Sequence, residues 1–197
     1  MNTKEKNQTQ TSISDFSPKK TLCHPKSHPP QKTPKNWPPE ILYRTAPTYS
    51  KTLSSQHLTS LKTPPKDTLL IPTSAAKGPS PVVKITPITT PSHPACGQSG
   101  LFAASDLKPG QFILQYLGII HASPNSNSNS PDSEGVHDSH ADSNYDLSLD
   151  RELRIGIDAD RMGNEARFIN DYRGVAERAN AEFRECWDER RGERGMG

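Results

Sequence analysis

The stretch GNEARFINDYRG, residues 163 to 174, places amide, guanidinium and aromatic side chains between two glycines. These side chains belong to Asn164, Arg167, Phe168, Asn170 and Tyr172. Amide and guanidinium groups form directional hydrogen bonds, and aromatic rings offer flat apolar faces. Because proline, serine and charged residues make up much of the chain, this run is our candidate binding segment.

Three histidines, His121, His137 and His140, raise the question of a metal site. Their spacing fits no established ligand pattern; His121 precedes a low-complexity insertion at residues 123–143, and His137 and His140 lie within it. The three cysteines lie far apart without a CxxC pair, so they form neither a disulfide framework nor a four-ligand zinc site on their own. We therefore expect no metal site, a reducing compartment and a long mobile loop at 123–143.

The candidate residues need a scaffold, and the middle of the chain predicts one made of strands. Residues 83–88 alternate as an edge strand, and residues 101–104 form a short buried run. Lys108-Pro109-Gly110 predicts a tight turn into the apolar run 112–120. The simplest interpretation is two strands, 101–104 and 112–120, joined by that turn.

Further elements follow from periodicity. Residues 145–149 and 155–157 alternate and predict a hairpin, followed by a short helix or an irregular turn from Asp160. Leucines at helical spacing within residues 53–61 indicate a short docking helix. Residues 179–194 have the local propensity of a helix.

Composition divides the chain near residue 97. Residues 1–97 hold 16 of the 19 prolines and a net charge of +9, whereas residues 98–197 carry a net charge of −7. With only 30% apolar residues, the chain can bury one modest core. We expect residues 1–67 to be a disordered region rich in Pro, Ser, Thr and Lys, and residues 68–197 to be the folded domain.

The termini and hydropathy predict no membrane partner. The N-terminus lacks the apolar run of a secretory signal, and no 18 consecutive residues are apolar. The segment SPKK at 17–20 and its neighbouring lysines allow weak nucleic-acid contact or nuclear import, but we favour a solvated tail, because the lysines are dispersed among prolines and form no tight patch.

Several short motifs occur in a distinctive order: GLFA (100–103), QYLG (115–118), YDLSL (145–149) and GIDADRMGNEARFIN (156–170). In this order they resemble the SET domain, the β-rich fold of protein lysine methyltransferases. The resemblance covers residues 80–197. It implies a mainly β, incomplete SET-like fold of short strands and hairpins, preceded by the disordered N-terminal region. It also implies a strand at residues 181–187, against the local helical propensity, because strand pairing overrides propensity.

The resemblance implies that S-adenosylmethionine binds in a surface pocket and that a substrate lysine enters through a narrow aromatic channel. An apolar channel lowers the pKa of the lysine amine, which must react in its neutral form. The segment carrying Gly100, Leu101 and Phe102 resembles the family's first cofactor-binding segment, where small residues allow close backbone approach.

Residues Arg167, Phe168, Asn170 and Asp171 resemble the family's RFxNH motif, in which the asparagine binds the amino-acid end of the cofactor. Tyr116, in a motif resembling EYxGE, and Tyr145 are the catalytic candidates that could line the lysine channel. Structural roles are the alternative: a tight turn at Gly100, core positions for Phe168 and Ile169, an ion pair of Arg167 with Asp158 or Asp160, and a turn cap at Asn170.

The sequence also departs from the family pattern. Asp171 stands where the family has histidine, and no ELxYDY-like segment with the family's catalytic tyrosine occurs. Two functions therefore remain open. One is an S-adenosylmethionine-dependent methyltransferase, truncated before that segment, acting on a basic peptide or histone-like tail in the nucleus or, alternatively, the cytoplasm. The other is an inactive SET-derived module that binds peptides along exposed strand edges.

Overall fold

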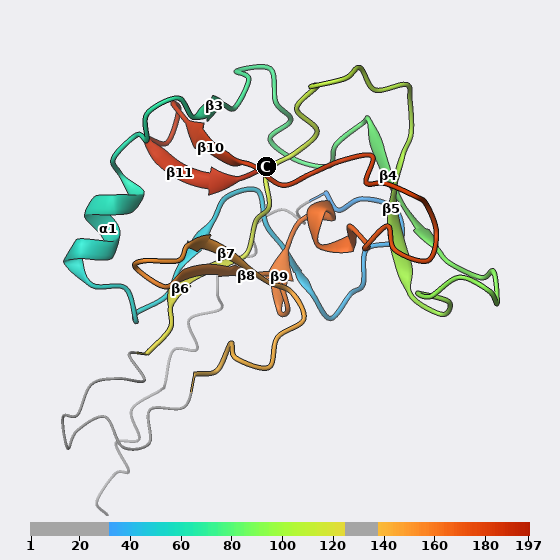
Figure 1. The fold of residues 1–197 in the computed structure, drawn as a ribbon, viewed down its shortest axis with the longest axis horizontal. Helices are drawn as coiled ribbons and strands as arrows, with labels where there is room; N and C mark the ends of the chain where they lie inside the picture. The colour runs from blue at the N-terminus through green and yellow to red at the C-terminus, as the bar shows by residue number, and fades with distance from the viewer. Residues whose placement is uncertain (1–31, 125–137) are drawn as a thin grey trace, which may run out of the picture. The chain divides into compact units, whose positions relative to one another are not determined.

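The computed structural model describes residues 32–124 and 138–197, which form a mainly β fold (Figure 1). Its strands are β1 Leu42–Tyr43, β2 Thr48–Tyr49, β3 Leu69–Leu70, β4 Val83–Pro87, β5 Ser99–Ala103, β6 Ile119–Ala122, β7 Asp146–Asp150, β8 Ile155–Asp158, β9 Met162–Gly163, β10 Glu185–Asp188 and β11 Glu193–Met196. Its helices are α1 Ser55–Leu61 and the 3-10 helix η2 Glu165–Phe168. The mainly β prediction is confirmed. The predictions for residues 1–31 and 125–137 lie outside the described residues.

The central sheet has the order β2-β6-β8-β7. β7 and β8 form the predicted antiparallel hairpin, and β8 also pairs antiparallel with β6. Ile120, Ile155 and Ile157 on these strands are each 1% exposed and form the centre of the hydrophobic core. The alternation that predicted the hairpin therefore marks the face of the sheet that packs inward.

Helix α1 closes one side of this core. Its first turn carries a capping box, in which the Ser54 hydroxyl accepts from the amide of His57 and His57 Nδ1 accepts from the amide of Ser54. Leu61 is fully buried against the sheet, whereas Leu58 remains 41% exposed. The predicted short helix is present. Among the described residues, no helix is long and apolar enough to span a membrane.

Ordered structure begins earlier in the chain than we expected. We placed residues 1–67 in a disordered region, but β1, β2 and α1 lie between residues 42 and 61. β1 pairs in parallel with β9, and β2 pairs in parallel with β6, where Thr48 lies opposite Ile119. Two-residue strands have almost no periodicity of their own, so their order comes from partners that are distant in sequence.

The strands predicted at 83–88 and 101–104 are present as β4 and β5, but they pair with each other. The interpretation that residues 101–104 pair with 112–120 was wrong. The Lys108–Gly110 turn does form, because the amide of Gln111 donates to the carbonyl of Lys108 over 3.0 Å and Gly110 adopts a φ of +72°. Beyond it, β6 begins at Ile119 and takes its partners from other parts of the chain.

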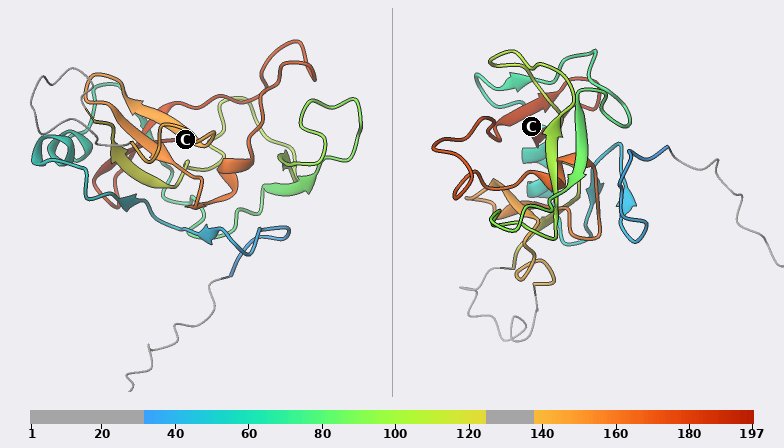
Figure 2. Two further views of the ribbon diagram at one scale, coloured as in Figure 1. Left: turned by 90° about the horizontal axis from the view of Figure 1, so that it is seen from below. Right: turned by 90° about the vertical axis from the view of Figure 1, so that its right-hand side faces the viewer.

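The segment 179–194 forms a strand rather than a helix. β10 pairs antiparallel with β11 and parallel with β3, so both of its edges are occupied. We expected a strand at residues 181–187 that lacks its partner; the observed strand begins at Glu185, and its partners lie within the chain. Figure 2 shows this sheet and α1 towards one side of the molecule and the β4–β5 hairpin at the other.

Candidate functional site

Asn164, in the polar run after β9, holds the chain on both sides of Tyr116. Its side-chain oxygen accepts from the amide of Leu117 over 3.2 Å, and its side-chain nitrogen donates to the carbonyl of Gln115 over 2.7 Å. Asn164 is only 6% exposed. Its amide therefore replaces a strand partner for residues 115–117, which are not in a regular sheet.

Glu165 joins the run to the N-terminal part of the fold. One carboxylate oxygen accepts from the hydroxyl of Tyr43 over 3.1 Å, and the other accepts from the amide of Ser80 over 2.7 Å. Burial, reinforced by this neighbouring carboxylate, raises the pKa of the Tyr43 hydroxyl above its ordinary value. Glu165 is therefore a structural acceptor for two segments that are far from it in sequence.

Arg167 is buried and supports the chain that follows β8. Its Nε donates to the carbonyl of Ala159 over 2.9 Å, and Nη2 donates to the carbonyl of Asp160 over 3.3 Å. The guanidinium carbon lies 4.1 Å from the centre of the Tyr145 ring. The guanidinium group of Arg167 therefore bonds to backbone carbonyls and makes a cation–π contact, in place of the ion pair with Asp158 or Asp160 that the sequence offered as an alternative.

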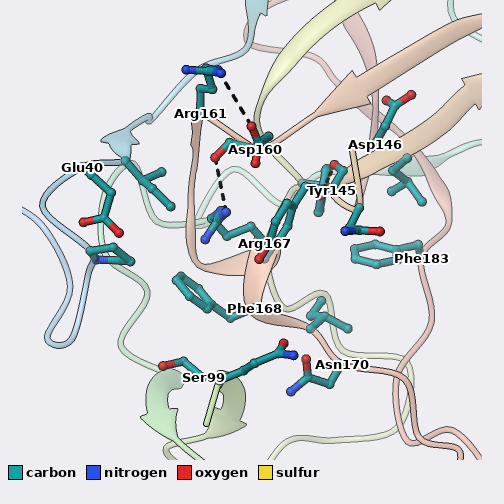
Figure 3. A pocket seen from close by; sticks show the side chains of 18 of the residues that line it. Glu40, Ser99, Tyr145, Asp146, Asp160, Arg161, Arg167, Phe168, Asn170 and Phe183 are labelled. Atoms are coloured by element: carbon teal, nitrogen blue, oxygen red, sulfur yellow. Dashed lines mark hydrogen bonds and ion pairs between the residues drawn. The ribbon is translucent and has the colours of Figure 1, made fainter. Parts of the chain in front are cut away.

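A hollow of about 1110 Å³ opens beside η2 (Figure 3). Five of the predicted site residues line it: Tyr116, Tyr145, Arg167, Phe168 and Asn170. They come from three separate parts of the chain, namely the segment before β6, the residue before β7, and η2 with the loop that follows it. The fold thus brings together residues that are up to 54 positions apart in sequence.

Gly100 lies directly beside Asn170. A Cβ atom added at Gly100 would lie 3.0 Å from the side-chain nitrogen of Asn170 and 2.9 Å from the ring of Phe102. The two residues that precede Gly100, Gln98 and Ser99, line the hollow. Figure 3 shows Ser99 and Asn170 at the same side of it. The absence of a side chain at position 100 therefore leaves the room in which the Asn170 amide sits.

Besides Gly100, three predicted cofactor residues are not among those that line the hollow. Leu101 pairs with Ile85 in the β4–β5 hairpin, and Phe102 is 43% exposed. The carboxylate of Asp171 accepts from Arg173 over 2.7 Å at the surface. Contact of these three residues with a cofactor stays a prediction.

Tyr116 is the more enclosed of the two tyrosines at the hollow. Its hydroxyl donates to the carbonyl of Tyr145 over 2.6 Å, and its ring meets Phe183 edge-on at 5.3 Å between centroids. Burial raises the pKa of the Tyr116 hydroxyl above its ordinary value, so the group stays protonated at neutral pH. Two aromatic rings and a neutral hydroxyl therefore face this end of the hollow.

The family model of the SET domain matches residues 98–194. The chain is a SET-domain protein. The SET family comprises protein lysine methyltransferases, and SET domains typically bind S-adenosylmethionine. A search of curated proteins found no match to the chain. The matched residues run from β5 into β11 and contain every predicted site residue, whereas β1–β4 and α1 precede the match.

Part of the SET-domain hollow comes from residues that the sequence interpretation missed. Pro38, Glu40 and Ile41, which lie before the matched region, line the hollow together with Phe183 near its other side. The only signal for the first group was the sequence NWPPEIL, an aromatic and apolar island in a polar region. Phe183 was missed because it lies four residues before Trp187, a spacing that favours a helix over the extended chain.

The histidines of this SET domain are used in packing. His121 lies 2.9 Å from a carboxylate oxygen of Asp146, and His140 lies 2.6 Å from one of Asp158. The two imidazole rings stack with centroids 3.8 Å apart. Within residues 32–124 and 138–197, no group of three histidine, cysteine or acidic side chains could hold a metal ion. His137 lies outside that part of the chain.

Proposed function

We propose that this SET domain transfers a methyl group from S-adenosylmethionine to the side-chain amine of a lysine in a basic peptide. The observation that carries the proposal is the position of Gly100 beside Asn170, at a hollow that four aromatic side chains also line. Nothing in the local sequence requires a glycine in strand β5 to touch an asparagine 70 residues later. A shared binding surface explains both residue types.

The residues present fit S-adenosylmethionine. Asn170 would hold its amino-acid end, and Gln98 and Ser99 offer further polar groups on the same wall. Position 100 has no room for a side chain, as expected where a backbone must approach a ligand closely. When bound, S-adenosylmethionine supplies an electrophilic methyl group to the reaction.

The tyrosines would orient the attacking amine. Tyr116 donates its only hydroxyl hydrogen to the carbonyl of Tyr145, so the lone pairs of its oxygen remain able to accept from an amine. The rings of Tyr116, Tyr145 and Phe183 exclude water at this end of the hollow. Exclusion of water lowers the pKa of a lysine amine and favours the neutral form that attacks. Alignment in such a site supplies much of the rate of a bimolecular transfer.

The charge of the lining favours cationic ligands. It contains three carboxylates and two guanidinium groups, which belong to Glu40, Asp146, Asp160, Arg161 and Arg167. The Arg161 side chain is 87% exposed and lies beside Asp160. Arg167 is buried against backbone carbonyls and the Tyr145 ring. A sulfonium group and a lysine-rich peptide both suit such a surface.

The wider biological setting follows from the same proposal. A histone-like tail is a substrate of the right charge for the region 98–197, whose net charge is −7. Histone methylation would place the protein in the nucleus. Contact of the lysine-rich N-terminal tail with nucleic acid belongs to this proposal too; it is supported by composition only, since that tail lies outside the described residues.

The proposal is tested by calorimetric titration of the full chain with S-adenosylmethionine, followed by transfer of a labelled methyl group to lysine-rich peptides. Replacing Asn170 by Ala should weaken cofactor binding about five- to tenfold, the cost of about one to two hydrogen bonds. Asn180→Ala, at an exposed asparagine that does not line the hollow, is the matched control. The lack of any binding by the unmodified chain would refute the proposal. Peptide binding without methyl transfer would favour the inactive binding module instead.

A further inference from the structure

The segment Trp37–Ile41 forms a wall of the hollow although it precedes the SET match by more than 50 residues. It is firmly anchored. The indole nitrogen of Trp37 donates to the carbonyl of Ile41 over 2.7 Å, which closes a tight turn. Before this turn, Asn36 donates to the carbonyl of Ile85 in β4 over 2.8 Å. After it, β1 pairs in parallel with β9.

Trp37 connects this wall to a predicted cofactor residue. Its ring meets Phe168 edge-on at 5.8 Å and Tyr43 edge-on at 5.0 Å. Phe168 is 8% exposed and lines the hollow. A large ring behind Phe168 restricts the positions that the Phe168 side chain can take. Trp37 is therefore a positioning residue, which acts on the hollow through Phe168.

Glu40 differs from the other carboxylates of the lining. Asp146 bonds to His121, and Asp160 lies 3.9 Å from Arg161. Glu40 forms no ion pair and no side-chain hydrogen bond with any residue in the described part of the chain. In Figure 3 it stands on the opposite side of the view from Phe183, beyond Arg167 and Phe168. Its negative charge is thus available to a ligand in the hollow.

We propose that Trp37–Ile41 is a ligand-selecting wall, in which Glu40 favours the cationic methyl donor over its neutral thioether product and Trp37 holds Phe168 in place. The inference rests on the proposed function, because it concerns ligands of the same hollow. An unpaired carboxylate attracts a sulfonium cation and has no comparable attraction for an uncharged thioether. Loss of the positive charge on methyl transfer would therefore weaken binding and promote release of the product.

The charge component is tested by titrating the full chain with S-adenosylmethionine and with S-adenosylhomocysteine at low ionic strength. Glu40→Gln should weaken binding of the first ligand about three- to tenfold, a range suited to a solvent-exposed charge, and leave binding of the second unchanged. The difference should shrink in 0.3 M salt. Glu177→Gln removes an exposed carboxylate that does not line the hollow and should change neither affinity.

The positioning component is tested with Trp37→Phe and Trp37→Ala. The phenylalanine variant retains an aromatic ring against Phe168 and should bind both ligands within about threefold of the unmodified chain. The alanine variant should lose about tenfold or more for both ligands at a temperature where circular dichroism shows that it is folded. If it is unfolded, Trp37→Leu at the same position takes its place.

The outcomes separate the inference from the function on which it rests. If the unmodified chain binds neither ligand, the proposed function fails and the inference falls with it. If the chain binds both ligands but Glu40→Gln weakens them equally or not at all, charge selection is refuted while the function stands. If removal of the Trp37 ring leaves both affinities unchanged in a folded variant, the positioning role is refuted.

Discussion

Replacement of Asn164 by alanine should destabilise the fold, although Asn164 is not itself among the residues that line the hollow. The side chain is buried and makes two hydrogen bonds, to the amide of Leu117 and to the carbonyl of Gln115. Alanine leaves both backbone groups without these partners. An unsatisfied buried polar group costs about 1–3 kcal/mol. Since some water will enter the space, we expect a total loss of about 2–4 kcal/mol in the free energy of unfolding.

The assay is urea unfolding followed by circular dichroism and tryptophan fluorescence. With a urea dependence of about 2 kcal/mol per molar for a domain of this size, the midpoint should fall by about 1–2 M. Asn180→Ala, at an exposed position, should stay within about 0.5 kcal/mol of the unmodified chain. A loss below about 0.5 kcal/mol for Asn164→Ala would refute the reasoning, because it would mean that residues 115–117 hold their conformation without this amide.

Three other perturbations probe the site, the C-terminal sheet and the cysteines. Gly100→Ala should lower affinity for S-adenosylmethionine more than it lowers stability, because the added methyl group displaces the Asn170 amide; equal affinity for both proteins in calorimetric titration would contradict this. Arginine neighbours hold the pKa of Asp188 below its ordinary value, although burial acts against them. The stability that the ionised Asp188 carboxylate contributes to the fold is therefore complete above the ordinary carboxyl pKa near 3.8, and it is lost as the pH falls through the lower pKa of the folded state. The urea midpoint of the unmodified chain should accordingly drop below about pH 4. The midpoint of Asp188→Asn should drop less over the same range. Burial raises the pKa of the Cys186 thiol to about 12, so a thiol reagent at pH 8 should modify exposed Cys96 in the folded protein and Cys186 only after denaturation.

Periodicity and turn chemistry predicted the elements whose partners lie close in the chain. The β7–β8 hairpin follows from the alternation of Leu147, Leu149, Ile155 and Ile157, and the turn at 108–110 follows from its proline and glycine. The resemblance to the SET family then identified the order of motifs and the strand near residue 185. These features could be predicted because each depends on residues that lie close together in the sequence.

Pairing between distant segments decided the rest. β10 has helix-forming neighbours but becomes a strand because β3 and β11 occupy both of its edges. The same cause orders residues 42–61, whose two-residue strands are defined by β9 and β6. No short window of sequence contains both members of the β3–β10, β1–β9 or β2–β6 pair, so no local pattern could have predicted them.

The sequence by itself determined the SET family and the candidate residues for its site, because Gly100, Asn170 and the tyrosines stand in a recognisable order. Only the tertiary structure decided which of these polar residues bind the backbone and which line the hollow. Asn164 and Arg167 bind backbone groups, Asn170 lies at the hollow, and residues 37–41 complete the wall. The physical reason is that a side chain's role depends on which unpaired backbone group or open space it faces, and both are created by segments remote from it in sequence.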